Sequence, residues 1–212
     1  MPLSDVLSYA RKLFTKDPPV GSVAELADFL DRHTSFMAQK CVIEFCRVRA
    51  GIYWQKLFEE EEFKDKLHQS CWESFTPVLA MILEVVDADL REAAGLRQRQ
   101  LPAALEAVAR QVIARHPVPQ GAPAEFWDRE FELIAERMKV ITGEPARPIE
   151  KMAAPMARKV FERLPIHKDI VQHDYDYIRN NLRMNLVRTH EDFLALARPD
   201  ELVAELLGEA EA

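Results

Sequence analysis

Residues 21–58, GSVAELADFLDRHTSFMAQKCVIEFCRVRAGIYWQKLF, decide the fold class of this chain. Ser22 followed by Glu25 is a capping-box pattern, in which the serine hydroxyl and the glutamate carboxylate accept hydrogen bonds from backbone N–H groups at a helix start. The apolar positions that follow are Phe29, Phe36, Met37, Cys41, Val42, Ile43, Phe45, Val48, Ile52, Trp54 and Leu57. They cover most of a helix circumference, which is typical of a helix buried on several sides. We therefore predict a long central helix from Ser22 to about Phe58.

One narrow polar stripe interrupts this apolar surface. With 3.6 residues per turn, His33, Lys40, Glu44, Arg47 and Gly51 fall within about 60° of arc. The stripe is either the solvent-exposed edge of the helix or a polar seam that faces another helix.

Helix signals recur along the rest of the chain, and strand signals do not. The run EEEEFKDK at residues 59–66 indicates a bend or helix junction. The further helices that we expect are one opened by Thr76-Pro77 and ended by Gly95, then 101–115, 123–141, 149–164 and about 169–188, and two short helices that begin at Thr189 and Pro199. The sequence therefore predicts an all-α, multi-helix bundle, in which the first helix packs against those that begin near Pro77 and Asp169.

The length fits a single helical domain over residues 1–212, with residues 189–212 as an optional small C-terminal appendage. The N-terminus lacks the uninterrupted apolar core of a secretory signal, so we expect a cytoplasmic protein. The longest apolar run, at residues 77–86, is much shorter than the roughly 20 residues that cross a bilayer, so no membrane span is expected.

The chain is acidic, with a formal net charge of -7 and a pI near 5.5. Nucleic-acid binding depends on clustered Lys and Arg that neutralise phosphates, so we expect no nucleic-acid partner.

The three cysteines, Cys41, Cys46 and Cys71, contain no CxxC pair, and we expect buried thiols that bind no metal. No two histidines have the spacing of a zinc site. The Glu-x-x-His pairs of a di-iron bundle, the P-loop, the nucleophile elbow and the dinucleotide glycine fingerprint are also missing from the sequence. No cofactor or metal is expected.

Residues 167–188, HKDIVQHDYDYIRNNLRMNLVR, contain the most unusual polar pattern. We interpret Asp169, with Gln172 three residues later, as the start of a helix. Two apolar stripes follow on its surface, one with Val171, Tyr175, Ile178, Leu182 and Leu186 and the other with Ile170, Tyr177 and Met184. Asp174, Asn181 and Asn185 lie between the stripes, whereas His173 and Asp176 lie across the helix on a more exposed side.

This polar row must be satisfied by partners, because a buried polar group without a hydrogen bond costs about 1–3 kcal/mol. The row is either a structural network with a neighbouring helix or the polar wall of a pocket. If it is a pocket wall, the candidate ligand-binding residues are Asp174, Tyr177, Asn181 and Asn185, joined by Glu44 and His33 from the long helix.

Two functions from different classes fit these patterns. The first is a non-catalytic cytoplasmic helical protein that binds a protein partner or an apolar small molecule, for which Met152, Met156 and Met184 could line a groove. The second is a metal-dependent or other helical-bundle enzyme with a polar site around His173 and Asp174. That dipeptide is similar to one in the HD-type metal phosphohydrolases, which are also helical, but the upstream His and downstream Asp of their pattern have no clear counterparts here.

Overall fold

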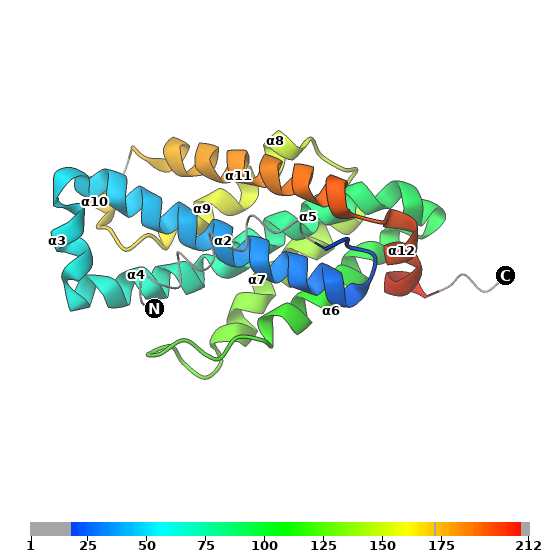
Figure 1. The fold of residues 1–212 in the computed structure, drawn as a ribbon, viewed down its shortest axis with the longest axis horizontal. Coiled ribbons are helices and arrows are strands. Elements are labelled where there is room, and N and C mark those ends of the chain that lie inside the picture. The colour runs from blue at the N-terminus through cyan, green and yellow to red at the C-terminus, as the bar shows by residue number, and fades with distance from the viewer. Residues whose placement is uncertain (1–17, 172, 209–212) are drawn as a thin grey trace.

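The protein is a bundle of helices in a computed structural model that describes residues 18–171 and 173–208 (Figure 1). The helices are α2 (Val23–Ala50), η1 (Gly51–Tyr53), α3 (Trp54–Glu59), α4 (Glu61–Glu73), α5 (Phe75–Ala94), η2 (Gly95–Gln100), α6 (Leu101–Ile113), α7 (Phe126–Gly143), α8 (Ile149–Met152), α9 (Ala154–Glu162), α10 (Lys168–Val171), α11 (Tyr175–Leu196) and α12 (Pro199–Leu207). Over these residues the only β contact is an isolated bridge. The all-α prediction is confirmed.

The most deeply buried helix is α5, not α2. Every residue from Phe75 to Asp87 is buried, and α5 packs against α2, α6, α7, α9, α11 and α12. This segment contains the most apolar run of the chain, so its burial follows from composition. The predicted packing of the first helix against those near Pro77 and Asp169 is confirmed, because α2 contacts both α5 and α11.

Helix α2 begins with the predicted capping box. The Glu25 backbone N–H donates to the Ser22 hydroxyl at 3.2 Å, and the Ser22 N–H donates to the Glu25 carboxylate at 3.0 Å. The helix ends at Ala50, and Gly51 follows with a φ of 55°, a conformation that glycine adopts at little cost. The predicted single helix to Phe58 is therefore wrong, because Gly51 turns the chain into η1 and α3.

Helices α2 and α11 lie side by side in opposite directions (Figure 1). Near one end of the pair, the Phe29 and Phe193 rings are 5.4 Å apart, and near the other end the Phe45 and Tyr177 rings are 5.9 Å apart. Beyond the end marked by Phe29 and Phe193, the segment before α2 is hydrogen-bonded to the segment after α11. The Val20 N–H donates to the Leu196 carbonyl and the Arg198 N–H donates to the Val20 carbonyl, both at 2.9 Å. We call this pairing the Val20 bridge.

Several predicted helix boundaries differ from the structure. The helix predicted at 169–188 is divided into α10 and α11, and Gln172, which was expected to complete its cap, lies outside the described residues. Thr189 is buried within α11 and does not start a helix. The predicted 149–164 helix is divided at Ala153, whereas the predicted helix at Pro199 is confirmed.

Over the described ranges, no helix has both the length and the apolar character needed to cross a membrane.

Candidate functional site

Asp174 lies immediately before α11 and forms an ion pair with Arg49 in the last turn of α2. The Arg49 Nε donates to the Asp174 carboxylate, and its Nη2 donates to the Ile170 carbonyl of α10 at 3.0 Å. One guanidinium therefore ties the end of α2 to both sides of the α10–α11 junction. The Asp174 side chain is 20% exposed, so the pair is only partly shielded from water.

Asn185 is buried and Asn181 is half-buried, so both lie on the inner side of α11 as predicted. The Asn185 Nδ2 donates to the backbone carbonyl of Asn181 at 2.8 Å and to its side-chain oxygen at 3.0 Å. These partners belong to the same helix, whereas the sequence suggested partners on a neighbouring one. His173 and Asp176 are exposed, in agreement with the prediction.

His33 and Glu44 are both half-buried on α2, and their separation of 11 positions corresponds to roughly 16 Å along the helix. The His33 ring stacks on Phe29 with centroids 4.1 Å apart, and its Nε2 is buried without a hydrogen-bond partner in the part of the chain that the structure describes. Burial, and secondarily the charge of Arg32, lowers the pKa of His33 to about 4. His33 is therefore a neutral imidazole near pH 7. The predicted site residues are spread along the α2–α11 pair.

The predicted apolar stripe of Ile170, Tyr177 and Met184 is exposed to solvent, which corrects the expected inward face of this segment. Val48 and Ile52, counted above among the buried positions of the long helix, are exposed as well, Ile52 to 87%. These errors have one cause: periodicity identifies an apolar stripe but not whether another element covers it.

Most of these exposed residues gather at one end of the molecule. On a helical wheel of α2, Phe45, Val48 and Arg49 fall within about 100° of each other, and Ile52 follows in η1. Phe45 contacts Tyr177, and Arg49 binds the Ile170 carbonyl, so the last turns of α2 lie beside α10 and the start of α11. The members of this surface, which we call the corner surface, are Val48, Ile52, Tyr53, Ile170 and Tyr177.

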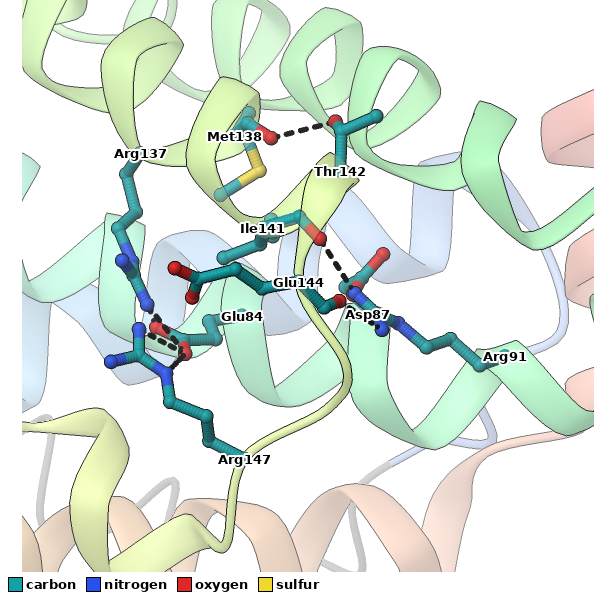
Figure 2. Close-up of polar contacts among 9 residues, drawn as sticks. All are labelled: Glu84, Asp87, Arg91, Arg137, Met138, Ile141, Thr142, Glu144 and Arg147. Carbon is teal, nitrogen blue, oxygen red and sulfur yellow. Dashed lines mark hydrogen bonds and ion pairs between the residues drawn. The ribbon is translucent and has the colours of Figure 1, made fainter.

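A second feature is a cluster of buried charges, which lies where α5, α7 and the loop after α7 meet (Figure 2). The Glu84 side chain is only 5% exposed and lies between two guanidinium groups. Arg137 Nε donates to Glu84 Oε2 at 2.9 Å, and Arg137 Nη2 lies 2.6 Å from Oε1. Arg147, from the loop, approaches the same Oε1 with Nε at 3.1 Å and Nη2 at 2.9 Å.

One helical turn further along α5, Asp87 pairs with Arg91 at 2.7 Å. Arg91 also donates to the Ile141 carbonyl at 2.9 Å and to the Glu144 carbonyl at 2.8 Å, which caps the end of α7. Burial raises the pKa of both Glu84 and Asp87, more than the neighbouring guanidinium groups lower it. The pocket beside these groups has a volume of about 10 Å³, which is roughly the space that one water molecule needs.

The sequence contains a signal for this cluster of buried charges, which the analysis of apolar stripes did not detect. Glu84 and Asp87 interrupt the most apolar helix of the chain at i and i+3, so both must face the same direction and both need partners. The partners themselves could not be named, because Arg137 and Arg147 are 53 and 63 residues away in the chain.

The thiols of Cys41 and Cys46 are buried and that of Cys71 is half-buried, in agreement with the prediction. Burial is the main cause that raises the pKa of each thiol to about 12, so all three are protonated near neutral pH. Within residues 18–171 and 173–208, no three His, Cys, Asp or Glu side chains are arranged to hold a metal ion.

No protein-family model, no curated protein and no solved structure matches this chain.

Proposed function

We propose that this chain is a non-catalytic helical protein that binds a protein partner through the corner surface. The observation that carries the proposal is the concentration of large apolar side chains at this end. Ile52 and Tyr53 are 87% and 70% exposed, and Val48, Ile170 and Tyr177 extend the same surface. Exposed apolar patches larger than a few hundred Å², especially those with a polar rim, mark interaction sites.

A protein partner fits this molecule better than an apolar small molecule. Small-molecule sites are concave and usually enclose about 300–1,000 Å³. The pocket beside Glu84 and Asp87 has room for about one water molecule and is bordered by charged side chains, which suits neither the size nor the chemistry of an apolar ligand. The corner surface offers exposed apolar side chains from α2, η1, α10 and α11, which suits a protein-binding site.

Two of the residues predicted for a ligand site have roles at this surface. Tyr177 contributes its own exposed ring. Asp174 acts indirectly, because its carboxylate accepts a hydrogen bond from Arg49, and Arg49 in turn donates to the backbone carbonyl of Ile170. We therefore assign Asp174 to the positioning of α10 against α2, so that Ile170 remains beside the apolar face of α2.

Site-specific photo-crosslinking in the cells that produce the protein tests the proposal. A photoreactive amino acid placed at Tyr53 should yield discrete crosslinked species. The same amino acid at Leu96, which is fully exposed on η2 outside the corner surface, is the matched control and should yield none. Equal crosslinking at both positions, or none at Tyr53, would contradict a binding role for the corner surface.

A further inference from the structure

Residues 3–14, LSDVLSYARKLF, precede the described part of the chain and carry a regular amphipathic pattern. With 3.6 residues per turn, the main apolar positions fall within about 120° of arc, and the charged positions fall outside this arc. These apolar positions are Leu3, Val6, Leu7, Ala10, Leu13 and Phe14. So short a helix is only marginally stable by itself in water, so the pattern needs a surface on which its apolar face can be buried.

Helix α2 packs against α4, α5, α6 and α11, which leaves one side of it facing away from the bundle (Figure 1). Phe36 and Ile43 lie on this side, within about 20° of each other on the helical wheel and opposite the buried Cys41. Both are half-buried, and over the described residues neither belongs to the hydrophobic core nor packs against it. Lys40 lies between them along the helix, over the Phe36 ring at 5.3 Å. We call Phe36, Lys40 and Ile43 the outer stripe of α2.

We infer that residues 3–14 form a helix that folds back along α2 and buries its apolar face on the outer stripe. The Val20 bridge fixes the point from which the segment departs, beside the start of α2. Residues 15–19 span at most about 17 Å, and a helix over residues 3–14 adds about 18 Å, so the segment reaches roughly 35 Å. Phe36 and Ile43 lie about 20 and 30 Å from the start of α2, within this reach. The corner surface, about 42 Å along the axis, lies beyond it.

The charges of the two elements favour this antiparallel course. Residues 11–16 carry three cations and no carboxylate, whereas residues 23–31 of α2 carry three carboxylates and no cation. Folding back at the Val20 bridge places these two stretches side by side, within the distance of about 10 Å over which charges attract each other in moderate salt. Asp28 and Asp31 also pair with Arg115, but the Asp28 side chain is 69% exposed and accessible to a second cation.

Hydrogen exchange of the full chain, read by mass spectrometry over residues 3–14, tests this inference. In the wild type, the amides of this segment should exchange at least roughly tenfold more slowly than those of a synthetic peptide of residues 1–17. Leu7→Asp places a charge in the apolar face and should remove this protection. Ser8→Asp is the matched control, because it adds the same charge on the opposite side of the same helix and should leave the protection unchanged. A helical circular dichroism spectrum will confirm that each variant is folded.

Intramolecular photo-crosslinking locates the surface that the segment covers. A photoreactive amino acid in place of Phe36 should crosslink to residues 1–17 in a product with the mass of one chain, and Leu7→Asp should abolish this crosslink. The same amino acid in place of Val140, which is 45% exposed on α7, is the control and should give no such product.

Each remaining outcome contradicts the inference. A wild-type segment that exchanges as fast as the peptide, or protection that persists in Leu7→Asp, would overturn the docked helix. Protection without a crosslink at Phe36 would place the helix on another surface. Crosslinked products with the mass of two chains would show that a second copy supplies the segment, and protection that arises only with phospholipid vesicles would assign the apolar face to a membrane.

Discussion

His33 makes the folded state sensitive to mild acid. Its folded pKa of about 4 lies below the ordinary value of 6.5, so the unfolded chain binds a proton before the folded one does. Its contribution to stability is complete above pH 6.5 and declines as the pH falls towards 4. Linkage gives a loss of about 2 kcal/mol in the free energy of unfolding between pH 7 and pH 5. Urea denaturation at the two pH values measures this loss.

His33→Gln provides the control, because glutamine does not titrate in this range. The free energy of unfolding of the variant should change much less between pH 7 and pH 5. The raised pKa values of Glu84 and Asp87 act with the opposite sign, since these groups favour the folded state when protonated and cannot replace His33 as the cause of acid destabilisation. An equal pH dependence in His33→Gln and the wild type would show that other groups cause it.

Glu84 is the carboxylate on which the buried charges of Arg137 and Arg147 depend. Glu84→Ala removes the partner of both guanidinium groups and leaves the buried Arg137 unpaired, so we expect a loss of about 3–5 kcal/mol in the free energy of unfolding. Glu62→Ala is the matched control, because Glu62 pairs with Lys66 on the surface, where solvent screens the pair, and it should change stability very little. Chemical denaturation of both variants compares them, and similar small losses would indicate that the Glu84 cluster contributes little to stability.

At the scale of elements, the tie between α2 and the α10–α11 junction depends on one ion pair. Because Arg49 and Asp174 have side chains that are 37% and 20% exposed, Asp174→Ala should cost only about 1 kcal/mol. His173→Ala, at an exposed position, should change stability by less than about 0.5 kcal/mol. A double-mutant cycle with Arg49→Ala isolates the pair, and a coupling energy near zero would show that the pair does not hold the junction.

The loop after α7 is fastened to α5 by Arg91, which binds the carbonyls of Ile141 and Glu144. Arg91→Ala should therefore increase hydrogen exchange over residues 141–148 more than anywhere else, since the end of α7 loses its cap. Arg188→Ala, on an exposed face of α11, controls for the loss of an arginine. Exchange that increases equally across the whole chain would instead indicate global destabilisation.

Sequence periodicity predicted the existence of the elements better than their ends or their buried faces. The capping box at Ser22 and the stop at Gly95 were predictable because each is a local pattern of a few residues. Thr189 was predicted to begin a helix, yet tertiary packing continues α11 through it. Tyr177 was placed on an apolar stripe correctly, but its exposure depends on what the neighbouring elements leave uncovered. The Arg partners of Glu84 depend on contacts over more than fifty residues, which no local pattern contains.

At the scale of the whole molecule, a single hydrophobic cluster joins residues from α2 to α12, including Phe29, Leu83, Leu186 and Leu202. A shared core of this kind favours one cooperative unfolding transition. The thiols of Cys41, Cys46 and Cys71 should thus become reactive only in the denaturant range where helicity is lost. Thiol labelling and circular dichroism, followed in the same urea series, measure this coincidence. Labelling of Cys41 or Cys46 well before the loss of helicity would reveal a subdomain that opens separately.

The position of the Val20 bridge sets the two ends of the α2–α11 pair far apart. Helix α2 is 28 residues long, so about 42 Å separates the bridge from the corner surface along its axis. The pair therefore acts as a spacer, which keeps whatever binds at the corner surface away from the chain segments that form the bridge. Spin labels at Leu194 and Ile52, which are both exposed and lie near opposite ends of the pair, would register this separation as a distance on the order of 40 Å.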